Sequence, residues 1–237
     1  MIAFAPVFDP PFAVVRAAYV ALGASDLSAS SAFYRDTLGL LESSADEDAL
    51  YLRGLEERNH HSLVLRRGEA LCHALGFKVA SEADLERAAA FFAAEGLEHG
   101  FVERAHQGRT LAAQDPLGLR LEFFFEMAQR PRALQRYGEY RGAQPQRLDH
   151  VNCFSPDVDA SVEFYRRLGF RLSEYTATDD APPRFWAAWL QRKGNVHDLA
   201  LTNGRGPRLH HLAYWLPGAL NVIHLCDLMA TTGYLGG

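Results

Sequence analysis

The chain has 237 residues, of which 48% are hydrophobic and 22% charged, and it carries a formal net charge of −5. This composition is typical of a folded globular protein of one large or two ordinary domains, and the charge excludes the basic surface that nucleic-acid binding needs. No apolar run reaches the roughly 20 residues that span a bilayer, and the N-terminus does not resemble a signal peptide. Its few, widely spaced cysteines, none in a C-x-x-C pair, predict reduced thiols in the cytoplasm: Cys72, Cys153 and Cys226.

The first predicted elements form a strand–helix–strands unit. An apolar strand pattern at 15–22 precedes an amphipathic helix over 25–40, and strand-like pieces follow at 49–55 and 60–66. Gly39 stands where a left-handed helix end favours glycine. A polar surface on one side of the helix and apolar residues on the other predict that it packs against these strands.

A second unit of the same kind follows. The strand pattern at 71–79 leads into a helix over 81–97, which Ser81 and Asp84 begin as a capping box and which Gly96 ends. The stretch 99–126 then holds a strand, a turn with the sequence Asp-Pro-Leu-Gly, and a closing strand. The polar, arginine-rich segment 128–146 is predicted to connect the two halves of the chain.

The second half repeats the first. A strand at 147–154 and a helix over 156–170 carry the same Phe-Tyr-Arg and Leu-Gly pattern as the first helix, with Phe33 matching Phe164 at an offset of 131 residues. Further strand patterns occupy 185–192 and 196–202, and a strand at 209–216 leads into a helix over 219–234. The repeat predicts an α+β fold of four units in two halves, with domains over 12–127 and 147–237 joined by 128–146.

The stretch RLHHLAYW at 208–215 places two histidines side by side in an apolar strand. Because side chains alternate faces along a strand, His210 and His211 point in opposite directions, and one of them is expected to face the interior. A buried imidazole is satisfied by a single hydrogen-bond partner, so this pattern alone admits both a core histidine and a functional one. A second pair, His60–His61, shows that adjacent histidines by themselves indicate little.

Several longer motifs carry a resemblance to a known family. They are YLRGLEERNHHSLVLR, QDPLGLRLEFFFE, QRYGEY, RLDHVNCFSPDV, WLQRKGNVHDLALT and GPRLHHLAYW. Together they make the chain, from about residue 12 onward, resemble the vicinal oxygen chelate superfamily, whose fold consists of tandem βαβββ modules. Within that superfamily the chain is similar to the type I extradiol ring-cleaving dioxygenases that act on 3,4-dihydroxyphenylacetate.

The resemblance implies a site in the second half. The family binds iron(II) through two histidines and a glutamate, which is the facial triad of non-haem iron oxygenases. The two histidines correspond to His150 and His211, and the ligand types alone also admit manganese(II). Asn152 and Trp189 correspond to residues that line the substrate pocket, and His197 corresponds to the family's acid/base histidine, whose pKa range suits proton transfer near neutrality.

The first half of the repeat acts as an internal control. His150 corresponds there to Tyr19 and His211 to Ala74, and neither residue supplies an imidazole ligand. Glu122 occupies the position of the third ligand but lacks histidine partners, which favours a structural role. By the same offset, the family's glutamate ligand falls about 22 residues beyond Gly237, so the fourth module is expected to be incomplete in this sequence.

The implied function is cleavage of a substituted catechol by O2, in a cytoplasmic homo-oligomer without nucleic-acid or membrane partners. A first alternative is a non-catalytic, small-molecule-binding or inactive truncated member of the same superfamily, which the missing glutamate favours. A second is a glyoxalase-type isomerase with zinc or nickel. The motifs around His197 and His211 match the dioxygenases more closely than such an isomerase. Against the non-catalytic alternative stand His197, Asn152 and the two histidines that correspond to ligands.

Overall fold

The computed structural model describes residues 2–234. Residues 235–237, which close the predicted C-terminal half, lie outside the described residues. The first module contains β1 (Val14–Ala24), α1 (Leu27–Ser31), η1 (Ala32–Thr37), β2 (Leu41–Ala45), β3 (Ala49–Arg53) and β4 (Leu63–Arg67). The second contains β5 (Cys72–Val79), α2 (Glu82–Ala94), β6 (His99–Arg104), β7 (Gly108–Gln114) and β8 (Arg120–Phe124).

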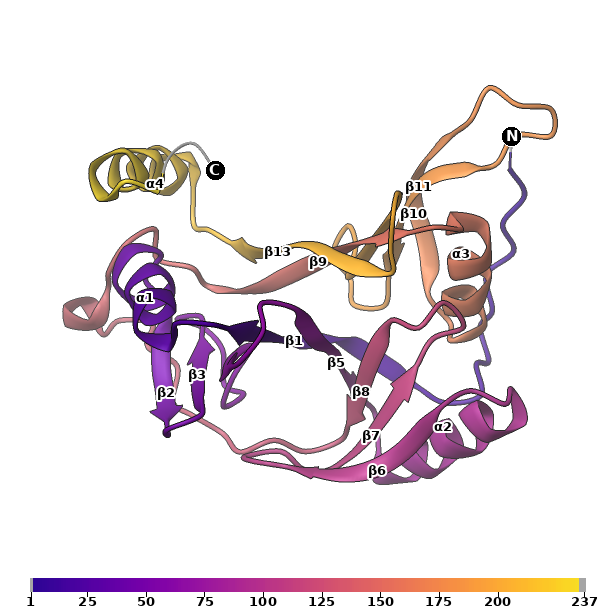
Figure 1. Cartoon of the computed structure of the whole chain (residues 1–237), viewed down its shortest axis with the longest axis horizontal. Coiled ribbons are helices and arrows are strands. Elements are labelled where there is room, and N and C mark those ends of the chain that lie inside the picture. The colour runs from indigo at the N-terminus through magenta and orange to yellow at the C-terminus, as the bar shows by residue number, and fades with distance from the viewer. Residues whose placement is uncertain (1, 235–237) are drawn as a thin grey trace. The chain divides into compact units, whose positions relative to one another are not determined.

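The third module contains β9 (Arg147–Ser155), α3 (Val158–Arg167), β10 (Arg171–Ala177), β11 (Phe185–Gln191) and β12 (Leu199–Asn203). A short 3₁₀ helix, η2 (Tyr137–Glu139), lies in the segment that precedes it. The described part of the fourth module comprises β13 (Arg208–Trp215) and α4 (Ala219–Thr232). Figure 1 shows β9 and β13 running side by side, and they are neighbours in one sheet.

The three modules whose strands are all described have the same strand order. It is β2-β3-β4-β1 in the first, β6-β7-β8-β5 in the second and β10-β11-β12-β9 in the third. In each, the strand before the helix pairs in parallel with the last strand, while the other pairs are antiparallel. The helix therefore acts as the crossover that a parallel pair requires. This repeated βαβββ order confirms the predicted α+β fold.

The chain divides by contacts into two compact units. Unit 1 holds the described residues of Met1–Ala18, Ala74–Met127 and Asp149–Ala213, and unit 2 holds the rest. Each unit therefore takes residues from both halves of the sequence repeat. The division into domains over 12–127 and 147–237 describes that repeat and stays a prediction.

Unit 1 is built around aromatic side chains from both halves. Phe123 of β8 lies 5.8 Å, ring centroid to ring centroid, from Phe77 of β5, and Phe77 lies at the same distance from Phe170, which follows α3. Phe92 of α2 contacts Phe164 of α3 at 6.1 Å. Because each buried aromatic side chain removes about 150–250 Å² from water, this cluster joins the second and third modules into one core.

The predicted helix ends are confirmed where glycine is needed. Gly39 and Gly96 have positive φ angles of 93° and 67°, and Gly169, the glycine of the matching Leu-Gly pair in the third module, has a φ of 79°. A Cβ atom at Gly39 would also stand 2.0 Å from the carbonyl oxygen of Arg141. At the start of α2, the Ser81 hydroxyl accepts a hydrogen bond from the backbone N–H of Asp84, as the capping box predicts.

Some elements differ from the sequence prediction. The helix expected over 25–40 is a single α-helical turn followed by the π-helical stretch η1. The strands β2 and β10 follow the helices of their modules and are largely unburied, so their polar sequences gave no strand pattern. No helix in the described part of the chain is long and apolar enough to cross a membrane. None of the residues of α4 is buried within the described structure.

Candidate metal centre

The site predicted from sequence lies on one face of the sheet formed by the third module. Along β9, the residues Val151, Cys153 and Ser155 are buried, whereas His150, Asn152 and Phe154 are only partly buried. This alternation follows from the period of two in a β-strand. His150 and Asn152 therefore point toward the same, more accessible face.

Trp189 points toward this face as well. In the sheet, Trp189 of β11 is paired with Ala200 of β12, and Ala200 is paired with Asn152 of β9. Residues opposite one another on neighbouring strands project from the same face, so Trp189 and Asn152 flank the small Ala200 side chain. The amide oxygen of Asn152 accepts a hydrogen bond of 3.2 Å from the Thr202 hydroxyl, which fixes the orientation of that amide.

His211 on β13 lies close to His150. The ring centroids are 5.5 Å apart and the ring planes are inclined by 77°. His211 also contacts its neighbour in the chain, because the Nδ1 atoms of His210 and His211 are 2.6 Å apart, which is hydrogen-bond distance. His210 also packs edge-on against Phe154, with a centroid separation of 4.7 Å.

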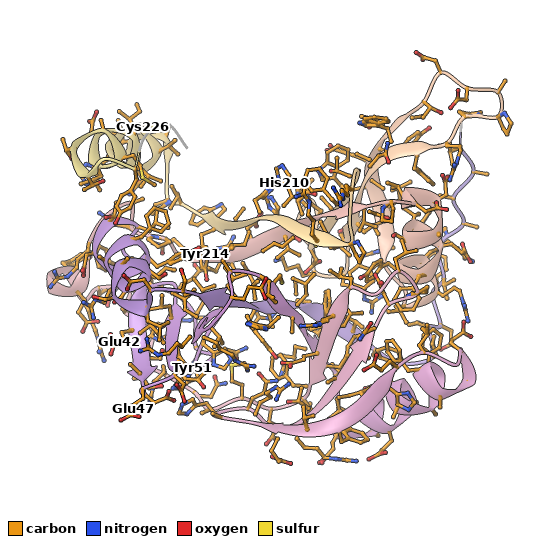
Figure 2. All side chains as sticks on the ribbon, in the orientation of Figure 1. Glu42, Glu47, Tyr51, His210, Tyr214 and Cys226 are labelled. Atoms are coloured by element: carbon orange, nitrogen blue, oxygen red, sulfur yellow. The ribbon has the colours of Figure 1, made fainter. Side chains whose placement is uncertain are left out.

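The expectation that one histidine of this pair faces the interior is wrong for the described residues. Both His210 and His211 are exposed, and Figure 2 shows His210 at the surface of β13. The reason is the position of β13, which forms the edge of its five-stranded sheet among residues 2–234. Desolvation of its ring by neighbouring groups, followed by the charges of His150 and His210, nevertheless lowers the pKa of His211.

His197 also lies against His150, from a different segment. The sequence suggested a strand at 196–202, but β12 begins only at Leu199, so His197 belongs to the loop between β11 and β12. Its ring centroid is 4.1 Å from that of His150, and its Nδ1 atom is buried without a hydrogen-bond partner among the described residues. Burial, followed by the charge of His150, lowers the pKa of His197 to about 4.

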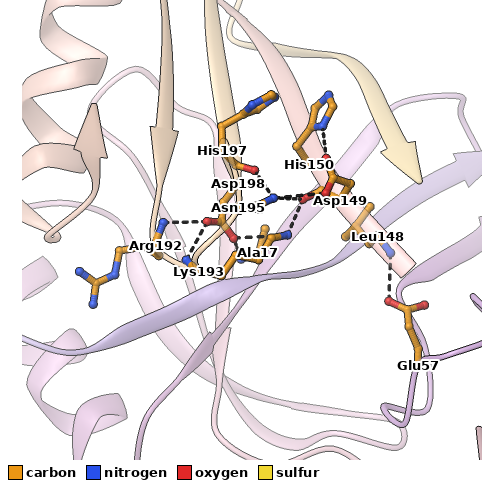
Figure 3. Close-up of polar contacts among 10 residues, drawn as sticks. All are labelled: Ala17, Glu57, Leu148, Asp149, His150, Arg192, Lys193, Asn195, His197 and Asp198. Carbon is orange, nitrogen blue, oxygen red and sulfur yellow. Dashed lines mark hydrogen bonds and ion pairs between the residues drawn. The ribbon is translucent and has the colours of Figure 1, made fainter. Parts of the chain in front are cut away.

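A buried carboxylate holds the loop that carries His197. Asp198 has no exposed surface. One of its oxygens accepts a hydrogen bond of 3.0 Å from the backbone N–H of Ala17, and the other accepts bonds from the backbone N–H groups of Arg192 and Lys193. Figure 3 shows these bonds joining the loop to β1. The position of the His197 ring against His150 therefore depends on Asp198.

Asp149, the residue before His150, forms polar contacts in the site that were not predicted from the sequence. Its Oδ2 atom lies 2.8 Å from His150 Nδ1, and its Oδ1 atom accepts a hydrogen bond of 3.2 Å from the amide of Asn195 (Figure 3). The bond with His150, opposed by burial and reinforced by Asn195 and the charge of Lys193, lowers the pKa of the Asp149 carboxyl. The sequence feature that could have indicated this role is a carboxylate residue directly before a predicted ligand histidine.

The residues at this site fit a metal ion held by two imidazoles. In both His150 and His211 the Nδ1 atom is engaged, by Asp149 and His210 respectively, while neither Nε2 atom has a hydrogen-bond partner among the described residues. Metal ions are bound by the lone pair of a neutral imidazole, commonly with the other ring nitrogen engaged in this way. Rings 5.5 Å apart are close enough to share one ion, because imidazole nitrogens bind metals at about 2.1 Å.

Within residues 2–234, no group of three histidine, cysteine, aspartate or glutamate side chains is arranged to hold a metal ion. Glu122, at the third-ligand position of the first half, is buried and accepts two hydrogen bonds from the Arg104 guanidinium. This contact agrees with the structural role predicted for it. His60 and His61 are also buried, and their Nδ1 atoms lie 3.3 Å apart.

Comparison with known proteins gives one family match and many similar structures. Residues 147–235 match the sequence profile of the glyoxalase/bleomycin resistance protein/dioxygenase superfamily. A solved structure of homoprotocatechuate 2,3-dioxygenase from Brevibacterium fuscum, in complex with 3,4-dihydroxyphenylacetate, is similar to this chain with a TM-score of 0.91 and 38% sequence identity. The match covers 98% of this chain and 73% of that one.

Two curated relatives differ in the metal that their names give. A manganese-dependent 2,3-dihydroxybiphenyl 1,2-dioxygenase from Geobacillus genomosp. 3 is 26% identical, and the match covers 91% of this chain and 73% of the relative. An iron-dependent extradiol dioxygenase from Rhodococcus jostii (strain RHA1) is 29% identical, and the match covers 88% of this chain and 70% of the relative. All three similar proteins are dioxygenases, and both curated relatives are longer than the part that this chain matches.

Proposed function

Because this chain belongs to the extradiol dioxygenases of the glyoxalase/bleomycin resistance protein/dioxygenase superfamily, we propose that it cleaves the ring of 3,4-dihydroxyphenylacetate. In this reaction the carbon–carbon bond beside the two hydroxyl groups breaks, and both atoms of O2 enter the product. One of the carbons becomes a carboxylate and the other an aldehyde, which gives a muconic semialdehyde. The choice of substrate rests on similarity to the Brevibacterium fuscum enzyme.

We propose that His150 and His211 hold iron(II) through their Nε2 atoms. The support is their engaged Nδ1 atoms and the proximity of the two rings. When bound, the metal would bring catechol and O2 together and supply the redox chemistry between them. We propose iron rather than manganese because the family that this chain resembles binds its metal through two histidines and a glutamate, the facial triad of iron(II) oxygenases. The names of the relatives include both metals.

The remaining predicted residues act on the substrate directly. Asn152 and Trp189 lie on the accessible face of the sheet on either side of Ala200, where their side chains orient the catechol ring. His197 accepts or donates a proton at its imidazole during ring opening, from a position against the ring of His150. Its buried Nδ1 atom, without a partner among the described residues, supports a role that a bound substrate completes.

The observation that carries this proposal is the convergence of three histidines from separate segments. His150 comes from β9, His211 from β13 and His197 from the loop before β12, and both other rings lie within 5.5 Å of the ring of His150. Sequence similarity to extradiol dioxygenases gives that arrangement its chemical meaning.

The test is oxygen consumption by the protein purified from its source organism and loaded anaerobically with iron(II). We expect O2 uptake and a yellow ring-fission product with 3,4-dihydroxyphenylacetate, and slower uptake with unsubstituted catechol. If no catechol supports O2 uptake although iron is bound, the protein is not a dioxygenase. If iron is not bound but the catechol is, the protein is a binding member of the superfamily.

We further propose a cytoplasmic location and assembly into a homo-oligomer. The location is supported by the cysteines, since no disulfide joins them in the described structure and thiols of this kind persist in a reducing compartment. The assembly follows from the family resemblance alone. Size-exclusion chromatography with light scattering tests it, and a mass of one chain, 26.4 kDa, would contradict it.

A further inference from the structure

Asp149 uses both of its carboxylate oxygens within the site. Oδ2 lies 2.8 Å from His150 Nδ1, and Oδ1 accepts a hydrogen bond from the Asn195 amide at 3.2 Å. The Lys193 ammonium group donates a hydrogen bond to the backbone carbonyl of Asp149. Hydrogen bonds to Oδ1 and to the backbone carbonyl therefore fix the position of Asp149, and its Oδ2 atom contacts the imidazole of His150.

The contact with Asp149 determines which nitrogen of His150 carries the proton. An ionised carboxylate only accepts hydrogen bonds, so Nδ1 of His150 must be the donor. In a neutral ring the proton on Nδ1 leaves the lone pair on Nε2. That lone pair is the one available to a metal ion. His210 gives no such direction to His211, because either imidazole of that pair can donate.

Asn195 links the same carboxylate to His197. Its amide nitrogen donates to Asp149 Oδ1 at 3.2 Å and to the backbone carbonyl of His197 at 2.7 Å (Figure 3). Both partners are acceptors, so the orientation of the amide is determined by its contacts. One side chain thus connects the residue that orients His150 with the backbone that carries the His197 ring.

We infer that Asp149 and Asn195 are a pair of positioning residues, in which Asp149 sets the tautomer of His150 and Asn195 holds the His197 backbone in register with it. The consequence for metal binding rests on the proposed function, in which His150 is a ligand. The tautomer itself does not depend on that function. Loss of such an outer contact typically weakens metal affinity by about 10–100-fold.

The first test needs no metal. Ring ¹⁵N chemical shifts of the ¹⁵N-histidine-labelled chain, assigned to His150 by comparison with a His150→Gln variant, distinguish the two neutral tautomers. We expect the proton on Nδ1 in the unmodified chain and a shift toward the Nε2 tautomer in Asp149→Ala. A proton on Nε2 in the unmodified chain, or an unchanged tautomer in Asp149→Ala, overturns the inference.

The second test measures iron(II) affinity by anaerobic calorimetry of the full chain. We expect Asp149→Ala to bind about 10–100-fold more weakly and Asp149→Asn to fall between the two, because its amide oxygen can still accept from Nδ1. Asp159→Asn is the matched control, since that carboxylate contacts Arg184 and Phe185 rather than a histidine, and its affinity should not change. Far-UV circular dichroism establishes that each variant is folded.

The two tests separate failure of the inference from failure of the function. If the unmodified chain binds iron(II) and Asp149→Ala binds it equally well, the positioning role is wrong and the metal site stands. If the unmodified chain does not bind iron(II), the metal role of His150 is wrong, and the ¹⁵N tautomer alone decides the role of Asp149.

Discussion

At the scale of single residues, the site is defined by which atoms are already engaged. His150 and His211 have their Nδ1 atoms in contact with a neighbouring side chain and their Nε2 atoms without partners in the described structure. His197 lies against His150 without belonging to the same strand. This difference supports the two kinds of role proposed for the three rings, with His150 and His211 as metal ligands and His197 as the proton-transfer group.

His197→Gln tests that division of roles. Removing a group that transfers a proton lowers the turnover rate by about 10²–10⁴-fold, whereas the two proposed ligand histidines remain in place. We therefore expect a large fall in kcat for O2 uptake with an unchanged iron(II) affinity, measured by anaerobic calorimetry. A matched loss of iron affinity would instead make His197 part of the metal site. His224→Gln, an exposed histidine of α4, serves as the control.

At the scale of elements, the strands supply a rigid face and the loop before β12 supplies His197. Asp198 fastens that loop through three backbone N–H groups, and its side chain is fully buried. The helix α2 is held in a similar way, because Asp84 accepts from the backbone N–H of Ala13 and from the Ser81 hydroxyl. Buried carboxylates therefore fix both a loop of the site and a helix of the core.

Asp198→Ala should loosen the loop and destabilise unit 1. The substitution leaves backbone donors of Ala17, Arg192 and Lys193 without their acceptor, and hydrogen bonds to a charged group contribute about 1.5–3 kcal/mol each. We expect the free energy of unfolding in urea to fall by about 2–4 kcal/mol. Asp180→Ala, at an exposed position, should change it by less than about 0.5 kcal/mol. Equal effects of the two substitutions would contradict the anchoring role of Asp198.

Asp84 predicts a defined pH dependence of stability. Burial alone would raise the pKa of this carboxyl, but hydrogen bonds from Ser81, Ala13 and Arg87 outweigh it and hold the pKa below its usual range. A group whose pKa is lower in the folded state contributes stability above its unfolded pKa and loses it as the pH falls through the folded value.

The stability difference between the unmodified chain and Asp84→Asn should therefore be largest near pH 7 and should shrink below about pH 4. Urea unfolding at a series of pH values measures it. A difference that stays constant down to pH 2 would show that the charge of Asp84 does not contribute, and that only its hydrogen-bond geometry matters.

At the scale of the whole molecule, one strand order recurs in three modules, and yet only the second half of the chain carries histidines at the predicted metal positions, His150 on β9 and His211 on β13. In the first half Tyr19 and Ala74 take their places, and Glu122 is engaged by Arg104. The same backbone arrangement thus serves as a structural repeat in one half and as a candidate metal centre in the other. The side chains at a few strand positions make the difference.

Metal binding to that centre should stabilise the chain as a whole. A ligand that binds only the folded state at 100 times its Kd adds about 2.7 kcal/mol, which corresponds to a rise in Tm of about 5–10 °C for a chain of this size. Differential scanning fluorimetry under anaerobic conditions, with iron(II) and then with a chelator, measures the shift. The double variant His150→Ala/His211→Ala should show none. A shift that persists in the double variant would place the bound metal elsewhere.

The amino-acid sequence by itself determined the fold, because the modules repeat. Apolar strand patterns, the Ser81 capping box and the glycines at helix ends act within a few residues of one another, and each was found where the pattern predicted it. The repeat then joined these local signals into four modules. The strands β2 and β10 were not predicted because they are largely exposed, so their sequences do not alternate between apolar and polar residues.

The candidate ligands also followed from sequence, through motifs that resemble a known family, but their surroundings were decided by the tertiary structure. Contacts between segments set them: the His197 ring lies against His150 across a loop, and Asn195 reaches Asp149 from another strand connection. The exposure of both His210 and His211 depends on the edge position of β13. Such facts depend on which segments meet in space, and a pattern along one strand records only which way each side chain points.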